Sequence, residues 1–327
     1  MSFGGISVSV FSVLYRKFFV KRYDDDNIIF HFAYTDFPGM EQRPVEFQTK
    51  QGLTVRGHIY SYPGEHGNDL VIFCHGMGGG HRSYMREIER ICRQGYEVLA
   101  YDNIGCWESD GSDIRGLSES VNDLVSCMDY IASSDELKNR NIHIIGHSWG
   151  GYAAGNILNF RTANIKSVTV ISGFASIDSF TEGGFGAKLK AFKKNLQNFE
   201  RKANPDYADS CSVDAFKDTK AKVLLVHSKD DKMADIRTGL EYVKSRVENP
   251  NVSYLEVDGK DHNPNYTQDA VSYFREVFGE YEKLVMMRKL RTPEQKKAFL
   301  DPKDFVRMTE QDEDIWKRIF ANMESAK

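Results

Sequence analysis

A serine between glycines is at the centre of the strongest chemical motif in this sequence. Ser148 lies in Gly146–Gly150, which reads GHSWG, follows the apolar run NIHIIG and precedes a stretch of small residues. This order predicts a strand, a sharp turn and a helix, with glycines where strand and helix approach closely. Such a turn exposes a hydroxyl that can attack a carbonyl carbon once a base removes its proton. A purely structural turn is the alternative, because the motif also arises by chance.

Two residues that could activate this serine follow later, each after a strand-like run. Asp231 comes after KVLLVH, and His262 comes after VSYLEV, just before a long helical pattern. A histidine that takes the hydroxyl proton and a carboxylate that orients it would complete the set in the chain order Ser, Asp, His. Asp230 competes with Asp231, because neighbouring residues of a turn point in different directions. We expect Ser148 as nucleophile and His262 as the base, with Asp231 or Asp230 as the acid.

Attack on a carbonyl puts negative charge on its oxygen, which needs hydrogen-bond donors. The backbone N–H of Trp149, directly after the serine, is one candidate. The other is the N–H of Met77, in the glycine-rich segment HGMGGG that follows DLVIFC. We expect His75 and Gly76 of that segment to contact substrate. The segment lacks the lysine and Ser/Thr of a phosphate-binding loop, which argues against nucleotide binding.

The elements that must position these residues alternate between strand-like and helical patterns from Val45 onward. This alternation is typical of an α/β fold with a mostly parallel sheet and helices on both faces. The predicted strands are 45–49, 53–61, 69–74, 97–101, 141–146, 167–172, 222–227 and 252–257, the first two forming a hairpin. The main predicted helices cover 117–132 and 269–287.

The alternation is interrupted between Gly173 and Lys220, in a segment too long for an ordinary loop. We interpret 173–220 as a helical lid inserted into a core made of 45–172 and 221–290. A lead-in with a helix (1–44) precedes the core. A helical tail (291–327) follows it, with helices at 293–299 and 310–323.

Four segments together resemble the α/β-hydrolase superfamily: FCHGMGGGHRSY, YDNIGCWESDG, GHSWGGYAAG and VHSKDD. The resemblance runs from about Val45 to the helix after His262. It implies the α/β-hydrolase fold. Within the superfamily, the four segments are similar to those of the bacterial branch of serine aminopeptidases and monoacylglycerol-lipase-like esterases. A strand followed by H-G-x-x-D, with the last aspartate catalytic, puts Asp231 in the acid position. Ser228 stands where that pattern has glycine, and Trp107 stands where many relatives have glycine.

Three aromatic residues are candidates for the substrate pocket. Trp107 would either narrow an acyl pocket or cap its own loop. Phe192 and Phe199 belong to an apolar stripe at helical spacing in the insertion and would line an acyl channel. The same helix is crowded with Lys188, Lys190, Lys193, Lys194, Arg201 and Lys202. This basic run is either a solvated face or an attraction for anionic headgroups and acidic substrates.

Composition narrows the possible partners. A formal net charge of −4 argues against nucleic acid. Five cysteines without paired spacing fit reduced thiols in a cytoplasmic protein, and we expect no metal and no cofactor. Near the N-terminus, Phe11, Leu14, Tyr15, Phe18 and Phe19 recur at helical spacing beside basic residues. That helix either docks on its own domain or makes weak peripheral contact with the inner face of a membrane.

Together these features predict a serine hydrolase of the carboxylesterase or lysophospholipase type, acting on a small-molecule acyl ester through an acyl-enzyme. An amidase, an aminopeptidase or a thioesterase would use the same three side chains. A non-catalytic binding protein on this fold and acyl transfer to an acceptor other than water are the remaining alternatives. The oligomeric state stays open.

Overall fold

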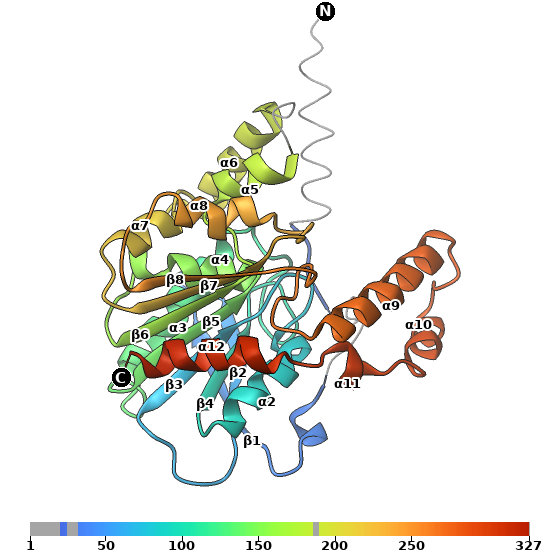
Figure 1. The fold of residues 1–327 in the computed structure, drawn as a ribbon, viewed down its shortest axis with the longest axis horizontal. Coiled ribbons are helices and arrows are strands. Elements are labelled where there is room, and N and C mark those ends of the chain that lie inside the picture. The colour runs from blue at the N-terminus through green and yellow to red at the C-terminus, as the bar shows by residue number, and fades with distance from the viewer. Residues whose placement is uncertain (1–19, 25–31, 186–189, 327) are drawn as a thin grey trace, which may run out of the picture.

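An eight-stranded sheet forms the centre of the computed structural model, which describes residues 20–24, 32–185 and 190–326 (Figure 1). The strand order is β1-β2-β4-β3-β5-β6-β7-β8. β1 pairs antiparallel with β2, as the predicted hairpin requires, β2 pairs antiparallel with β4, and all other neighbours are parallel. The strands are β1 (Glu41–Gln48), β2 (Thr54–Ser61), β3 (Asp69–Cys74), β4 (Glu97–Asp102), β5 (Asn141–His147), β6 (Ile165–Ile171), β7 (Lys222–Ser228) and β8 (Val252–Val257).

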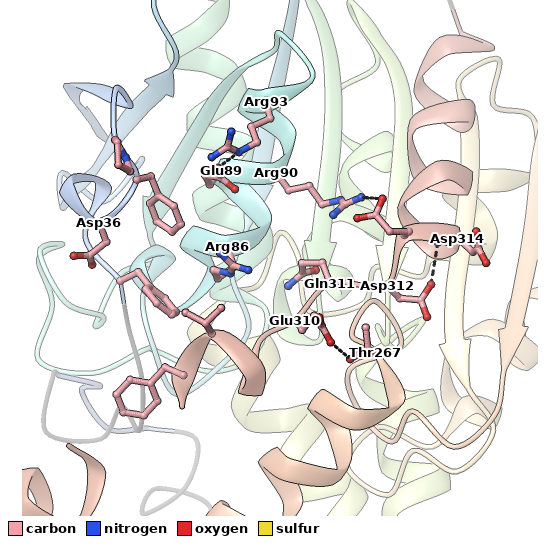
Figure 2. Close-up of a pocket in the computed structure, with 16 residues that line it drawn as sticks. Asp36, Arg86, Glu89, Arg90, Arg93, Thr267, Glu310, Gln311, Asp312 and Asp314 are labelled. Carbon is pink, nitrogen blue, oxygen red and sulfur yellow. Dashed lines mark hydrogen bonds and ion pairs between the residues drawn. The ribbon is translucent and has the colours of Figure 1, made fainter. Parts of the chain in front are cut away.

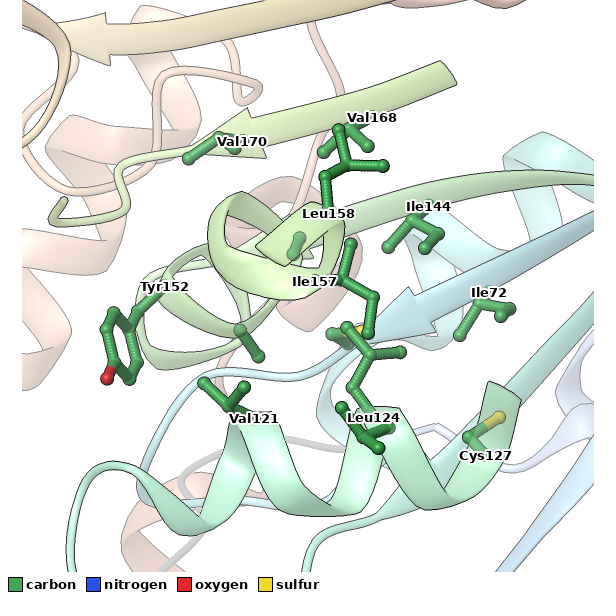
Figure 3. Packing of buried hydrophobic residues seen from close by; sticks show 14 of the residues in the cluster. Ile72, Val121, Leu124, Cys127, Ile144, Tyr152, Ile157, Leu158, Val168 and Val170 are labelled. Atoms are coloured by element: carbon green, nitrogen blue, oxygen red, sulfur yellow. The ribbon is translucent and has the colours of Figure 1, made fainter. Parts of the chain in front are cut away.

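Most residues of β3, β5, β6 and β7 are buried because helices cover both faces of the sheet. One face packs against α3 (Glu119–Ser133), α4 (Trp149–Asn156), α7 (Ser212–Lys217) and α8 (Leu240–Lys244). In Figure 3, Val121 and Leu124 of α3 and Ile157 after α4 meet Ile72 and Ile144 of the strands. All five of these side chains are completely buried.

The opposite face is covered by α2 (Met85–Arg93) and by the C-terminal helix α12 (Glu313–Glu324). Trp316 and Ile319 of α12 are fully buried there, and α12 contacts β6 and β7. The helix expected in the tail therefore contributes to the main core. α9 (Gln268–Met286) instead projects away from the sheet, beside α10 (Pro293–Leu300) and α11 (Phe305–Met308) (Figure 1).

The segment between β6 and β7 contains α5 (Ile177–Phe185) and α6 (Lys190–Ala203), which precede α7. Figure 1 shows α5 and α6 projecting from the core above α4. The aromatic stripe predicted at 11–19 lies outside the described residues. None of the helices in the described ranges is both long and apolar enough to cross a membrane.

Candidate active site

Ser148 lies at a strained turn between β5 and α4. Its backbone has φ 56° and ψ −115°, a conformation that is costly for a residue with a side chain. The flanking glycines permit the turn: a Cβ on Gly146 would lie 2.2 Å from the carbonyl oxygen of Gly150, and a Cβ on Gly150 would lie 2.1 Å from that of Cys74. The predicted strand, turn and helix are confirmed.

Asp231 and His262 meet in the loops that follow β7 and β8. The Nδ1 of His262 lies 2.8 Å from Oδ2 of Asp231. The backbone N–H groups of Met233 and Ala234 donate to the other carboxylate oxygen at 2.8 and 2.9 Å. Burial by itself raises the pKa of Asp231, but hydrogen bonds from His227 and His262 outweigh it and hold this pKa well below its usual range. The carboxylate is therefore ionised at neutral pH and acts as acceptor for the imidazole.

Asp230 points elsewhere. Its Oδ1 accepts hydrogen bonds from the Ser228 hydroxyl at 2.5 Å and from the backbone N–H of Asp261 at 3.2 Å. The same Ser228 oxygen accepts from the N–H of Lys260 at 3.2 Å. The serine that departs from the family pattern thus links the loop after β7 to the loop that carries His262.

Ser148 and His262 line one small cavity of about 160 Å³. The Nε2 of His262 is buried there and has no hydrogen-bond partner among the described residues. Met77 and Trp149, the expected oxyanion donors, line the same cavity, and so does Gly76. The structure therefore brings together five residues predicted from separate parts of the sequence.

Tyr84 joins the glycine-rich segment to the serine turn, and the sequence pattern did not indicate it. Its hydroxyl accepts from the N–H of Gly76 at 3.1 Å and lies 2.9 Å from Nδ1 of His147. The Nε2 of His147 lies 2.8 Å from the carbonyl oxygen of His262. Because a carbonyl can only accept, His147 carries its proton on Nε2, and Tyr84 donates to Nδ1. This chain of hydrogen bonds connects the three segments that surround Ser148.

Known proteins share this architecture. A profile of the alpha/beta hydrolase fold matches residues 69–210, which include Ser148. An esterase of Pyrococcus furiosus superimposes with a TM-score of 0.57 at 19% sequence identity, covering 82% of this chain and 97% of that one. A puromycin hydrolase gives a TM-score of 0.54 at 17% identity, covering 73% of this chain and 40% of that one.

The chain has the α/β-hydrolase fold.

Sequence relatives match this chain over shorter stretches. A protein of Azorhizobium caulinodans that carries the name carbamate hydrolase is 28% identical over 122 residues, 37% of this chain and 43% of the relative. A proline iminopeptidase of Clostridioides difficile is 29% identical over 111 residues, 34% of this chain and 37% of the relative. Each match spans less than half of the relative, so the substrate has to be argued from the site.

Two of the residues expected to touch substrate have other tasks in this structure. The His75 ring is fully buried, where its Nε2 accepts from the N–H of Asn103 at 2.9 Å. Trp107 has a positive φ of 40° and lies under the guanidinium of Arg82, 4.7 Å from the ring centroid. Neither lines the cavity at Ser148. The imidazole and the indole instead hold the loops around them.

The insertion contributes to the cavity through residues other than the predicted stripe. Phe180 of α5 lines it together with Phe174, and their ring centroids lie 4.6 Å apart. Phe199 packs against the main core and lines no cavity at Ser148, and the Phe192 side chain lies outside what the structure describes. Phe180 was missed because its helix is short and lacks a clear apolar period.

Glu200 anchors the same insertion. Its fully buried carboxylate accepts hydrogen bonds from the N–H groups of Leu117 and Ser118 at 2.7 and 3.0 Å. The carbonyl of Leu117 in turn accepts from the indole of Trp149 at 2.6 Å. The second half of α6 is thus attached to the wall of the Ser148 cavity and does not act as a loose flap there.

A larger cleft of about 1070 Å³ lies between α2 and the segment before α12 (Figure 2). Arg86, Arg90 and Arg93 of α2 face Glu310, Gln311 and Asp312 across it. None of the predicted site residues lines this cleft. Arg90 of α2 forms an ion pair with Glu313 of α12 at 2.5 Å. This pair links the two helices.

Proposed function

We propose that this chain is a serine hydrolase that cleaves carboxylic esters through an acyl-enzyme. The observation that supports this most is the state of His262. One ring nitrogen is bound to Asp231 at 2.8 Å, and the other is buried in the cavity that Ser148 lines, with no hydrogen-bond partner in the part of the chain that the structure describes. An imidazole oriented in this way is suited to take the proton of a hydroxyl.

In the proposed reaction, Ser148 Oγ attacks the ester carbonyl carbon while Nε2 of His262 takes its proton. Asp231 stabilises the imidazolium that forms. The N–H groups of Met77 and Trp149 donate to the oxyanion, a contribution typically worth about 3–4 kcal/mol per donor. The bond to the alcohol oxygen then breaks as His262 returns the proton to it. Water repeats the sequence and releases the acid.

The lining of the cavity favours an ester over a peptide substrate. An aminopeptidase has to bind a free amino group, for which a carboxylate is the natural partner. Among the described residues that line the Ser148 cavity, none is a carboxylate, and several are apolar. This supports the esterase interpretation of the resemblance more than the aminopeptidase one, although proline iminopeptidases are among the sequence relatives.

Labelling with a fluorophosphonate probe tests the proposal. We expect stoichiometric labelling of wild-type protein and none of Ser148→Ala, with turnover of a good acyl ester lowered by about 10⁶. Ser133→Ala, at an exposed position of α3, is the matched control and should react normally. A panel of acyl esters, thioesters and aminoacyl amides then ranks the substrate classes. Near wild-type turnover by Ser148→Ala, or a preference for aminoacyl amides, would contradict the proposal.

A further inference from the structure

A second cavity continues from the Ser148 cavity along helix α9. Its volume is about 500 Å³, against about 160 Å³ for the first. The residues that line both cavities are Gly76, Met77, Tyr84, His147, Met233 and His262. We call the second cavity the α9 groove. The shared wall means that one bound molecule can occupy both spaces while its reacting atoms lie beside Ser148.

The floor of the α9 groove comes from α9, which supplies three apolar residues together with Arg275, Gly279 and Glu282. Val271, Phe274 and Phe278 line it at helical spacing. The rings of Phe274 and Phe278 stack in parallel, with centroids 5.6 Å apart and planes at 9°. At 1.5 Å per residue the three side chains extend over about 10 Å of the helix. A floor of this kind fits an extended hydrocarbon chain.

The other face of α9 has a separate, structural task. Asp269 pairs with Arg307 at 2.7 Å, the Tyr273 hydroxyl accepts from the N–H of Asp304 at 3.1 Å, and Glu280 pairs with Lys303 at 2.9 Å. These contacts fasten α9 to α11 and to the loop before it. They position α9 from the side opposite the groove. The residues of α9 that line the groove are therefore not needed to hold the helix in place.

The position of His262 indicates which end of an ester lies in the groove. His262 lines both cavities, but its neighbours Asp261 and Asn263 line only the α9 groove, whereas Trp149, Leu117 and the two phenyl rings Phe174 and Phe180 line only the smaller cavity. His262 must pass its proton to the departing oxygen, so the alcohol part of the substrate has to lie on the His262 side. The acyl part then lies in the smaller cavity, whose volume is about a third of that of the α9 groove.

We propose that the α9 groove binds the apolar alcohol of the ester, and that the enzyme prefers a short acyl group joined to a long alkyl chain. This rests on the proposed serine hydrolase function. In the step concerned, the C–O bond to Ser148 forms and the C–O bond to the alkyl oxygen breaks. The serine proton moves through His262 to that oxygen, and the alcohol leaves along α9.

Gly279 offers a way to fill the groove without disturbing the fold. It lines the groove within α9, and a Cβ built on it meets nothing within 4 Å. Leucine also favours a helix more than glycine does. Gly279→Leu is therefore expected to fold normally and to shorten the space for the alkyl chain. Glu276→Leu places the same side chain on an exposed part of the same helix outside the groove, and it is the matched control.

Two isomeric esters distinguish the ends of the substrate: octyl acetate has a long alcohol, and ethyl octanoate has a long acyl chain. Each methylene kept out of the groove costs about fourfold in binding, so Gly279→Leu should lower kcat/KM for octyl acetate by more than about tenfold. Ethyl octanoate should change less than about twofold, and Glu276→Leu should affect neither ester. A selective loss on ethyl octanoate, an equal loss on both, or no loss on either would overturn the proposal.

A binding measurement separates the groove from the chemistry. In Ser148→Ala protein, calorimetry should detect binding of 1-decanol, and adding Gly279→Leu should weaken it by more than about tenfold. A different outcome is that wild-type protein turns over no ester, while Ser148→Ala protein binds 1-decanol and loses this binding with Gly279→Leu. That result would contradict the proposed hydrolase function and would support the groove as the site of the alcohol. If Gly279→Leu leaves decanol binding unchanged, the groove proposal is overturned even where esters are hydrolysed.

Discussion

The imidazole of His147 contacts the imidazole of His262 edge to face, with ring centroids 4.9 Å apart and planes at 61°. Burial, together with the neighbouring His262, lowers the pKa of His147 to about 3, so this ring is neutral at physiological pH. A neutral ring can donate from Nε2 to the His262 carbonyl and accept at Nδ1 from Tyr84. His147 therefore helps to hold the loop that carries His262.

Removing the Tyr84 hydroxyl tests this chain of contacts. Tyr84→Phe leaves the Gly76 N–H and His147 Nδ1 without their partner, which typically costs about 1–3 kcal/mol. Because both groups border the reacting atoms, we expect kcat for a good ester to fall about tenfold or more, with less change in KM. Circular dichroism should show an intact fold. Tyr62→Phe removes a comparable hydroxyl that bonds Glu89 at 3.0 Å, far from the site, and should leave kcat unchanged. Equal effects of the two variants would show that Tyr84 has no positioning role.

The two neighbouring aspartates should differ strongly in their contribution to turnover. Asp231→Asn replaces the acceptor of His262 Nδ1 and favours the wrong tautomer of the imidazole, which costs about 10⁴ in kcat in comparable triads. Asp230→Asn disturbs only the contacts to Ser228 and Asp261, and a loss below about tenfold is expected. Steady-state kinetics on one ester ranks the two variants. The opposite order would move the acid to Asp230.

Glu87 should make the stability of the protein depend on pH. Burial raises the pKa of this carboxyl from 4.5 to about 7. Between these values the unfolded chain has lost the proton while the folded chain keeps it. The stabilising contribution is therefore fully present below pH 4.5 and is lost as the pH rises through about 7. The difference in pKa corresponds to about 3 kcal/mol.

Glu87→Gln should remove this dependence, since the amide does not titrate. Urea unfolding above neutral pH should show the variant to be more stable than wild type by up to about 3 kcal/mol, and the gap should close toward pH 5. Glu276→Gln, at an exposed position, provides the comparison. A constant gap at all pH values would assign the effect to packing and not to the proton.

Two glycines of α4 should respond in opposite ways to alanine. A Cβ on Gly150 would lie 2.1 Å from the Cys74 carbonyl oxygen, so Gly150→Ala must push α4 away from β3. We expect a loss of about 1–3 kcal/mol and a lower melting temperature. The nearest neighbour of a Cβ on Gly155 is 3.4 Å away, and Gly155→Ala should be neutral or stabilise by about 0.5–1 kcal/mol. Similar losses in both variants would mean that helix packing tolerates neither change.

The sequence determined the features that depend on neighbours along the chain. The strands at 69–74 and 252–257 have the predicted bounds. The first is a run of apolar residues ended by turn residues, which indicates a buried parallel strand. The turn at Ser148 was also predictable, because its motif spans five consecutive residues and Gly146 is required by the close approach of Gly150. The chain order of Ser148, Asp231 and His262 at successive strand ends follows from the same local patterns.

Only the tertiary structure decided which surfaces the helices cover and which polar groups meet. α9 and α12 both have an apolar face, but α12 covers the sheet and α9 borders a groove. Periodicity shows that a helix has such a face and does not say what packs against it. Tyr84, Glu200 and Phe180 reach the site across long stretches of chain, and one turn directs Asp231 toward His262 and Asp230 away from it. Contacts of this kind depend on distances between elements, which the order of residues alone does not specify.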